Sequence, residues 1–437
     1  MNTILIRAED KNKWERRTPL IPSDLKEIIK KAPTNAFIEK SSKRIFREEE
    51  YVEAGAEICE GMDVGKVILG VKEIPKEKIL DNKTYLFFSH TIKGQKENMP
   101  MLQRILDSGS TLIDFEKITD KQGRRLVYFG PFAGDAGALD ILWLVGEYWQ
   151  HKGIQTPFDQ CQQANNYDSV TDAKEKLNKI GKQIRTEGLP AEISPLVIGI
   201  MGYGNVSKGA QNIFNALPVK YILPEELSTL EQSEKTLFNT VYVVVFKEEH
   251  MVRRVDGRPF DLQDYYNFPE NYESVFEQYL PYLSILVNAT YWDKRYPRFV
   301  TWDGLRQLYA SGKEPKLCAI ADITCDVNGS IECNVKSTDT GMPAYLVDAR
   351  TKSVTDGHKG EGIVLLAVDN LPAELPRDAS TFFSNQLKPF LPSLIHADYG
   401  KPLAESGLDE ALQKAAIVYN GELTSNFKYI QRYLDSK

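Results

Sequence analysis

Short apolar runs alternate with polar, helix-like segments over the first 140 residues of the chain. This rhythm predicts an α/β sheet, because each buried strand must be followed by a segment that covers it. Residues 133–153 then predict a long helix whose first residues are small and permit close packing, and residues 168–188 predict a polar helix that ends in glycine. The runs expected to form strands are Ile4 to Arg7, Ala36 to Glu39, Val67 to Val71, Tyr85 to Phe88 and Thr111 to Phe115.

After Pro190 the apolar runs become continuous, beginning with SPLVIGIMG. Continuous runs are typical of strands that a parallel sheet buries on both faces. The stretch from Ser380 to Lys437 predicts helices that pack back on the first domain. We therefore predict an α/β fold of two Rossmann-like domains with parallel sheets, separated by an interdomain cleft. The expected domains are a discontinuous substrate and catalytic domain, 1–140 plus 375–437, and a dinucleotide-binding Rossmann domain, 141–374.

Composition and charge narrow the class of protein. A chain of 437 residues suits two domains, and 42% hydrophobic with 26% charged residues is typical of a globular protein. The formal net charge of -7 argues against nucleic-acid binding, and no apolar stretch is long enough to span a membrane. The first residues resemble neither a signal peptide nor a transit peptide, so we expect a cytoplasmic protein. None of the five cysteines forms a CxxC pair, and we expect no metal site.

A glycine pattern follows the strand predicted after Pro190. Gly202 and Gly204 come directly after this strand and before a predicted helix that Asn205 and Val206 open. In this context the first glycine permits a tight turn, and the second lets the backbone approach a pyrophosphate at the helix N-terminus. Ser207 stands where GxGxxG has its third glycine, and the acid expected about 20 residues later for the ribose is absent from VKYILPEEL. A plain strand-to-helix turn is the alternative interpretation.

Polar residues close three predicted strands of the first domain. Lys72 follows VILGV, His90 ends YLFFSH, and Glu116 lies just past TLIDF. If these strands are parallel neighbours, their carboxyl ends share the sheet edge where α/β folds bind ligands. Lysine, histidine and carboxylate together suit proton transfer around a carbonyl or an imine. A solvated strand end is the alternative for Lys72, and the sequence leaves open whether Glu73 tunes Lys72 or faces water.

Two further groups of charged residues are candidates for substrate or cofactor contacts. Arg16 and Arg17 precede a predicted helix start, and arginine's planar fork suits a carboxylate. A solvated surface cluster is the alternative. Asp322 and Asp326 lie at a strand end and in the following loop. With neither a histidine nor a third acid nearby, we expect a positioning role for them rather than metal binding.

Several of these segments, in this order, resemble the alanine dehydrogenase and saccharopine dehydrogenase superfamily. Within it the chain is most similar to the lysine-2-oxoglutarate reductase domain, which forms the N-terminal half of aminoadipate semialdehyde synthase. The segments that carry the resemblance are ERRTPLIP, GVKEIP, LFFSHTIKGQ, LIDFE, FAGDAGALD, YGNVSKGAQ, YWDKRYPR, DITCD, NGSIE and VDNLPAELP.

The resemblance implies NAD(P)H-dependent reductive condensation of L-lysine with 2-oxoglutarate to saccharopine, with NADP slightly favoured over NAD. It implies that Lys72 and His90 are the acid and base, and that Glu116 tunes their charges. Arg17, with Arg16, would contact a substrate carboxylate. The residues implied to bind the cofactor are Gly202, Gly204, Asn205 and Val206 at the pyrophosphate, and Asn288, Asp322, Asp326 and Asn370 toward the nicotinamide.

Two alternatives to this function remain at the level of sequence. One is an alanine or opine-type amino-acid dehydrogenase of the same superfamily, which would use the same lysine and histidine on a smaller amine. The other is a dinucleotide-binding protein without catalysis. The expected ligands are L-lysine, 2-oxoglutarate and saccharopine, and a separate glutamate-forming saccharopine dehydrogenase would act as a partner enzyme.

Overall fold

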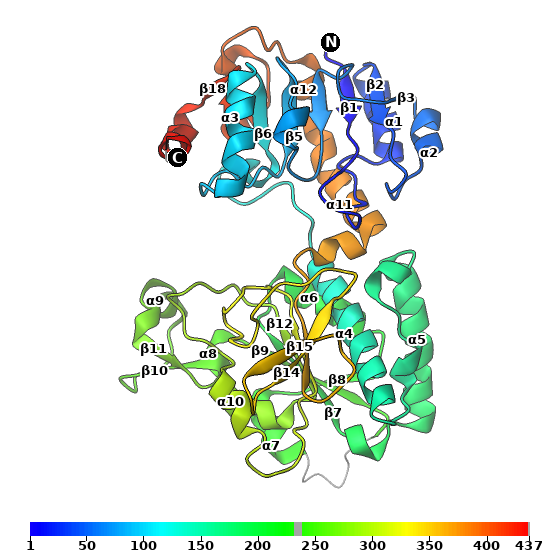
Figure 1. The fold of residues 1–437 in the computed structure, drawn as a ribbon, viewed down its shortest axis with the longest axis vertical. Coiled ribbons are helices and arrows are strands. Elements are labelled where there is room, and N and C mark those ends of the chain that lie inside the picture. Colours follow the sequence, from blue (N-terminus) through cyan, green and yellow to red (C-terminus); the bar gives the residue numbers. More distant parts are fainter. Residues whose placement is uncertain (231–237, 436–437) are drawn as a thin grey trace. The chain divides into compact units, whose positions relative to one another are not determined.

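The computed structural model describes residues 1–230 and 238–435. The chain forms two compact units (Figure 1). Unit 1 comprises Met1–Gly130 and Pro376–Lys437, and unit 2 comprises Pro131–Leu375. In the described part of the chain, no helix is both long and apolar enough to cross a membrane.

Unit 1 is built on a sheet with strand order β18-β17-β6-β5-β4-β1-β2-β3. The strands from β3 to β6 run parallel, whereas β17 is antiparallel to β6 and forms a hairpin with β18. The strands are β1 (Ile4–Ile6), β2 (Ala36–Glu39), β3 (Ala56–Cys59), β4 (Val67–Leu69), β5 (Thr84–Phe87), β6 (Thr111–Asp114), β17 (Ala416–Tyr419) and β18 (Glu422–Leu423). The five strands predicted for this region are confirmed.

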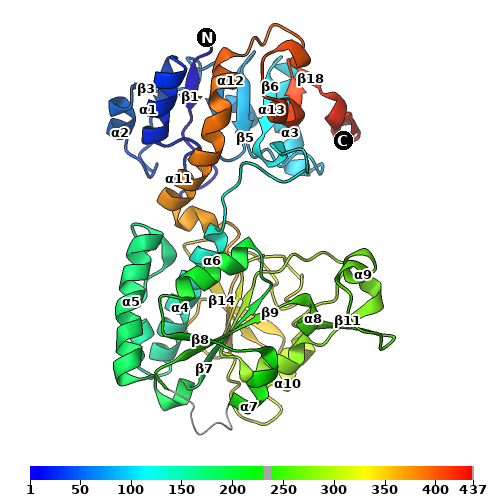
Figure 2. The same cartoon turned by 180° about the vertical axis from the view of Figure 1, so that it is seen from behind.

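Helices cover both faces of the first sheet, which explains why its central strands are apolar throughout. Ile4, Ile6 and Leu69 pack on the face covered by α1, α11 and α12 (Figure 2), while Leu5 and Ile68 pack on the opposite face, which α3 covers. The helices are α1 (Pro22–Lys31), α2 (Glu48–Glu53), α3 (Met99–Asp107), α11 (Pro376–Leu387), α12 (Leu391–His396), α13 (Glu410–Ala415) and α14 (Gln431–Leu434).

The prediction of helices alone for Ser380 to Lys437 is wrong at β17 and β18. Asn420 and Gly421 both have positive φ, 48° and 84°, and close the two-residue turn between these strands. An Asn-Gly pair favours such a hairpin turn, because both residues tolerate the left-handed region. The apolar run before the turn then pairs with β6 and completes the sheet.

Unit 2 carries a second sheet, with strand order β15-β14-β16-β13-β12-β7-β9-β8. The strands from β16 to β8 are parallel, and β14 and β15 add an antiparallel edge. The strands are β7 (Leu196–Met201), β8 (Val219–Tyr221), β9 (Val241–Phe246), β12 (Ile285–Asn288), β13 (Ala319–Asp322), β14 (Ala344–Asp348), β15 (Ser353–Asp356) and β16 (Ile363–Leu366), and a separate pair is formed by β10 (Val252–Arg254) and β11 (Tyr272–Ser274).

Two helices of unit 2 pack with their backbones in close approach. A Cβ added at Gly134 in α4 would overlap the Val206 carbonyl oxygen of α6, and one at Gly209 would overlap the Pro131 carbonyl oxygen. The small residues predicted to permit close packing therefore do so. The unit 2 helices are α4 (Phe132–His151), α5 (Val170–Glu187), α6 (Asn205–Phe214), α7 (Leu227–Leu230), α8 (Glu248–Met251), α9 (Leu262–Asn267) and α10 (Trp302–Gln307), of which α4 and α5 confirm the two predicted helices.

Candidate active site

The carboxyl ends of β1, β4 and β5, which are parallel neighbours in unit 1, lie at one edge of the sheet. Leu69 of β4 lies in register with Ile6 of β1 and with Leu86 of β5. Lys72 is three residues beyond the end of β4, and His90 is three residues beyond the end of β5. The fold thus brings the two predicted proton-transfer residues to the same edge.

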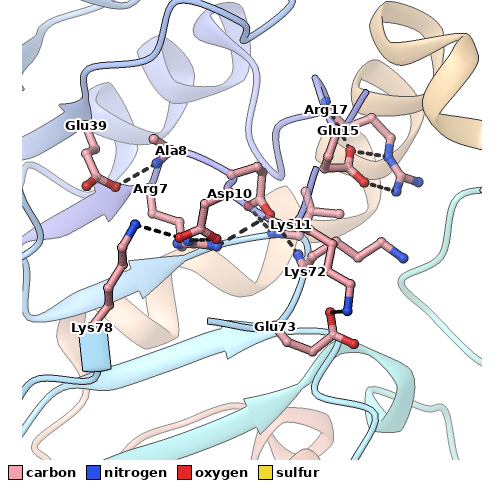
Figure 3. Close-up of polar contacts among 12 residues, drawn as sticks. Arg7, Ala8, Asp10, Lys11, Glu15, Arg17, Glu39, Lys72, Glu73 and Lys78 are labelled. Atoms are coloured by element: carbon pink, nitrogen blue, oxygen red, sulfur yellow. Dashed lines mark hydrogen bonds and ion pairs between the residues drawn. The ribbon is translucent and has the colours of Figure 1, made fainter. Parts of the chain in front are cut away.

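A buried carboxylate holds the chain that carries Lys72. Glu9, only 6% exposed, accepts the backbone N–H of Val71 at 2.6 Å and that of Lys72 at 3.0 Å. Arg7, which is also buried, lies 3.5 Å from the Glu9 carboxylate, and its guanidinium lies 2.7 Å from the carboxylate of Asp10 (Figure 3). Burial raises the pKa of Glu9, although the Arg7 charge opposes this shift. Two backbone bonds from one rigid acceptor fix the direction in which the chain leaves β4.

His90 forms a close pair with Glu73. The imidazole Nδ1 lies 2.5 Å from Glu73 Oε1, and Lys11 Nζ lies 3.3 Å from the other carboxylate oxygen. Burial alone would raise the pKa of Glu73, but the hydrogen bond and charge of His90, with Lys11, lower it to about 2. An ionised carboxylate on Nδ1 orients the ring and leaves Nε2 as the nitrogen that exchanges a proton with a ligand. Glu73, which the sequence left without a role, therefore contacts His90.

The backbone around His90 is held in an uncommon conformation. His90 has a φ of 48°, in the left-handed region that non-glycine residues seldom adopt. The fully buried Asp114 accepts the Ser89 N–H at 3.0 Å and also the Ser89 hydroxyl, and Asn98 donates to the His90 carbonyl at 3.2 Å. Strain of this kind persists where neighbouring contacts impose it, and it is concentrated at functional sites.

Glu116 occupies a different environment from Glu73. Its backbone N–H donates to Asp114 at 2.7 Å, and its carboxylate forms an ion pair with Arg125. The Arg125 side chain is half exposed to solvent, so this pair is screened. Of the two glutamates, Glu73 is the one that contacts His90, and the tuning role of Glu116 stays a prediction.

The two arginines of the WERR segment are held differently. Arg17 is 3% exposed and makes a two-pronged ion pair with the buried Glu15, at 2.8 Å and 2.6 Å. Its guanidinium also stacks 4.0 Å from the Phe129 ring. Arg16 is half-buried and donates from Nε to the Lys43 carbonyl at 3.3 Å. Arg17 is therefore a preorganised cation whose partner is a carboxylate of the same segment.

The glycine turn of unit 2 has the geometry that a dinucleotide requires. Gly202 has a φ of 90°, and a Cβ there would meet the Ala289 carbonyl at 2.8 Å. A Cβ at Gly204 would meet no atom within 4 Å, so the backbone there faces open space. Asn205 and Val206 form the first turn of α6, whose N-terminal amides attract phosphate. The turn and the first turn of α6 together fit a pyrophosphate. Gly202 and Gly204 line a cavity of about 270 Å³ together with the loop after β12.

Asn288 and Asp322 lie in register at the ends of β12 and β13 and bind each other. Asn288 Nδ2 lies 2.8 Å from Asp322 Oδ1, and both side chains are buried. Burial raises the pKa of Asp322, although Asn334 donates to it at 2.8 Å. Asn288 Oδ1 accepts the Thr290 hydroxyl at 2.7 Å, and Thr290 lines the cavity. This pair therefore supports the cavity wall from behind.

The other two predicted cofactor residues lie outside the strands β12 and β13. Asp326 is exposed in the loop after β13, and Asn370 precedes the short helix η10 (Leu371–Glu374). Both stay predictions.

No function was assigned from the sequence to three residues that the structure places at these sites. Glu73 was noted next to Lys72, but the role of Glu73 was left open. Glu9 follows a strand end, as Lys72 and His90 do, so the same argument could have found it. Glu248 lines the glycine cavity from the end of β9, a position that follows from the strand order alone.

The chain is an α/β protein of two units, each built on a mostly parallel sheet, and this is the class of fold that the comparisons with known proteins find. Residues 5–136 match the family model for the N-terminal domain of alanine dehydrogenase/PNT, and residues 198–426 match that for the C-terminal domain. The chain belongs to the alanine dehydrogenase/PNT family. A solved L-alanine dehydrogenase covers 99% of this chain with a TM-score of 0.60 at 18% identity, which shows the shared fold.

The chain is also similar to curated proteins named as enzymes of saccharopine and aminoadipic semialdehyde metabolism. The chain is 38% identical over 446 residues to mitochondrial alpha-aminoadipic semialdehyde synthase of Bos taurus, covering 99% of this chain and 48% of that protein. It is 38% identical to the Arabidopsis thaliana protein named alpha-aminoadipic semialdehyde synthase, covering 98% of this chain and 41% of that protein. The chain thus spans about half the length of these relatives. It is also 27% identical to saccharopine dehydrogenase [NAD(+), L-lysine-forming] of Emericella nidulans, covering 89% of this chain and 91% of that protein.

Proposed function

We propose that the chain catalyses the reductive condensation of L-lysine with 2-oxoglutarate to saccharopine, using NADH or NADPH. The observation that carries the proposal is the match to a lysine-forming saccharopine dehydrogenase over about nine tenths of both chains. The polar strand ends of unit 1 support it, because this reaction needs repeated proton transfer at one nitrogen and one oxygen. In this assignment unit 1 holds the substrates and unit 2 the dinucleotide.

Lys72 and His90 would carry the proton transfers. The lysine substrate must lose a proton before its ε-amine attacks the keto carbon, and the resulting carbinolamine must gain one to release water. His90, oriented by Glu73, would move a proton through Nε2, and Lys72, held by Glu9, would act as the second group. The bound dinucleotide supplies the hydride that reduces the imine. The balance is one NAD(P)H and one proton consumed, with saccharopine, NAD(P)⁺ and water formed.

Arg17 and Arg16 would bind substrate carboxylates. The substrates together bear three carboxylates, and a guanidinium binds such a group through two parallel hydrogen bonds. The bidentate pair with Glu15 holds the Arg17 guanidinium in one orientation, and a substrate carboxylate would have to bind it in that orientation or displace Glu15. Glu116, Asn288, Asp322, Asp326 and Asn370 keep the supporting roles expected from the sequence as proposals.

The experiment that tests the function follows the absorbance of NADH and of NADPH with lysine plus 2-oxoglutarate, and omits each substrate in turn. Oxidation that requires both substrates supports the proposal. Oxidation with ammonia and pyruvate, and none with lysine and 2-oxoglutarate, would identify an alanine-type dehydrogenase. Binding of the dinucleotide without turnover on any keto acid and amine would indicate a non-catalytic protein.

Two wider expectations belong to the same proposal. A separate glutamate-forming saccharopine dehydrogenase would be the partner enzyme that takes the saccharopine onward. We place the protein in the cytoplasm, whereas the bovine relative is named as a mitochondrial protein. Cell fractionation with detection of the chain checks the compartment.

A further inference from the structure

The strand beside the glycine turn in unit 2 is β9, not β8. Met201, the last residue of β7, lies in register with Phe246, the last residue of β9, and the Gly202 N–H donates to the Phe246 carbonyl at 2.8 Å. β8 follows α6 in the sequence but pairs with the outer side of β9, and it ends at Tyr221, opposite Val243. An acid at the end of β8 would therefore lie away from the glycine turn, because β8 stops short of this edge and does not adjoin the turn.

An acid does stand at the end of β9. Glu248 is two residues beyond Phe246 and lines the same cavity as Gly202, Gly204 and Thr290. In doubly wound sheets the adenosine ribose lies over the strand next to the glycine turn, and the residue at the end of that strand contacts its hydroxyls. Glu248 occupies this position through the strand order, although it is more than twice as far along the chain as the usual spacing of about 20 residues.

The polar contacts of Glu248 come from hydroxyl groups. Tyr266 donates its hydroxyl to Glu248 Oε1 at 2.8 Å, and Tyr203, within the glycine turn, lines the same cavity. The negative charge of Glu248 is the largest cause that raises the pKa of Tyr203. A carboxylate that already binds hydroxyl donors in the cavity is suited to accept the hydroxyls of a ribose.

The basic residue that the sequence offered for a 2′-phosphate lies away from the end of β9. This residue, Lys220, lies in register with Tyr242, four residues before the end of β9. At about 3.3 Å per residue, this is roughly 13 Å from the sheet edge.

We infer that Glu248 accepts the 2′- and 3′-hydroxyls of the adenosine ribose and so selects NAD(H) over NADP(H). This inference rests on the dinucleotide-dependent function proposed above and fixes its cofactor. A 2′-phosphate carries close to two negative charges and would lie against the Glu248 carboxylate, which repels it and loses its hydroxyl donor. The conclusion opposes the slight preference for NADP that the resemblance implied.

The test measures binding by isothermal titration calorimetry with NADH and NADPH, without lysine or 2-oxoglutarate. A second pair of probes, 5′-AMP and 2′,5′-ADP, isolates the adenosine ribose from the rest of the dinucleotide. The variants are Glu248→Gln, which removes the charge, and Glu249→Gln, a matched control that removes the same charge from the adjacent exposed residue. Thermal unfolding confirms that both variants are folded.

The expected result is a Kd for NADH at least about tenfold below that for NADPH, and for 5′-AMP below that for 2′,5′-ADP. Glu248→Gln should lose most of this ratio, and Glu249→Gln should keep it. Equal or tighter binding of NADPH by the unchanged protein overturns the inference, as does a ratio that survives Glu248→Gln. Because no substrate is present, a clear preference for NADH without turnover on lysine would reject the proposed reaction and leave this inference standing.

Discussion

Glu73 and His90 form a carboxylate–imidazole pair in which Glu73 Oε1 and His90 Nδ1 are 2.5 Å apart. The pair joins the segments that follow β4 and β5, so it links the strand end that carries Lys72 to the one that carries His90. In a protein that transfers protons, such a carboxylate fixes the tautomer of the ring and stabilises its charged form.

Replacing Glu73 by Gln should lower turnover by about 10²-fold, because the amide keeps the shape and loses the charge that orients and stabilises the protonated ring. Steady-state kinetics with lysine and 2-oxoglutarate measures the effect. The control is Glu77→Gln, since Glu77 is an exposed residue of the nearby helix η1 (Lys76–Lys78). Equal turnover of Glu73→Gln and the control would contradict a role for the pair in catalysis.

The same pair predicts a pH dependence of stability. The pKa of Glu73 is lowered to about 2, whereas an unfolded glutamate titrates near 4.3. A lowered carboxyl pKa stabilises the folded state above the unfolded value, and this stabilisation is lost as the pH falls from about 4.3 toward 2. The thermal midpoint of the unchanged protein should therefore fall more steeply below pH 5 than that of Glu73→Gln. Parallel curves for the two proteins would show that the pair contributes nothing to stability.

Lys72→Met and His90→Gln should each reduce turnover by about 10²- to 10⁴-fold, the range expected for general acid or base residues. Binding of the dinucleotide should change little, because the glycine turn lies in unit 2 and both substitutions lie in unit 1. Stopped assays of saccharopine formation and calorimetric titration with NADH measure the two quantities. Lys76→Met, at an exposed lysine, is the control. Unchanged turnover in both variants would reject the assignment.

Two buried carboxyl groups in unit 2 predict the opposite pH dependence. Asp140 of α4 and Glu374 of η10 are each at most 1% exposed, and burial raises the pKa of both. Above about pH 4 these two carboxyl groups lose their protons in the unfolded state but keep them in the folded state. The free energy of unfolding therefore decreases as the pH rises from about 4 through the pKa values of the folded protein. Glu374→Gln should flatten this decrease between pH 5 and pH 8 in thermal unfolding. If the stability of Glu374→Gln decreases with pH as steeply as that of the unchanged protein, Glu374 does not cause this pH dependence.

Gly134→Ala should destabilise unit 2 by about 2–4 kcal/mol, because the added methyl overlaps the Val206 carbonyl and forces α4 away from α6. The affinity for NADH should fall as well, since α6 begins at the glycine turn. Chemical denaturation and calorimetric titration measure both effects. Gly61→Ala is the control, because its Cβ would meet its nearest neighbour at an ordinary 3.5 Å. Full stability of Gly134→Ala would show that the two helices separate at little cost.

The order of hydrophobic residues predicted most of the fold because buried parallel strands must be apolar on both faces. It located the central strands of both sheets and the helices α4 and α5. It did not reveal the order of β8 and β9, because pairing between strands depends on packing across the sheet and leaves no local pattern. The sequence therefore offered the end of β8 as the place for a ribose acid, whereas the strand that adjoins the glycine turn is β9.

The candidate site was predictable where chemistry coincides with a strand end. Lys72 and His90 stood out because each closes an apolar run. Glu73 gave no such signal, since a charged residue before a proline is ordinary in a loop, and its contact with His90 depends on the neighbouring strand. Glu9 also follows a strand end, so the sequence offered its position, but its contacts with the backbone N–H groups of Val71 and Lys72 depend on the pairing of β1 with β4.

The split of unit 1 around unit 2 determines the order in which the protein can fold during synthesis. Unit 2 is one continuous stretch, whereas β6 must wait for β17, which the ribosome releases only after the whole of unit 2. Folding of unit 1 must bring together two segments that are separated by the whole of unit 2, and closing so long a loop is slow. Until α11 and α12 have been synthesised, the apolar surface of the first sheet that they cover is exposed to water. The unit that begins the chain is therefore the last to be completed, and one face of its sheet stays partly uncovered while unit 2 is being made.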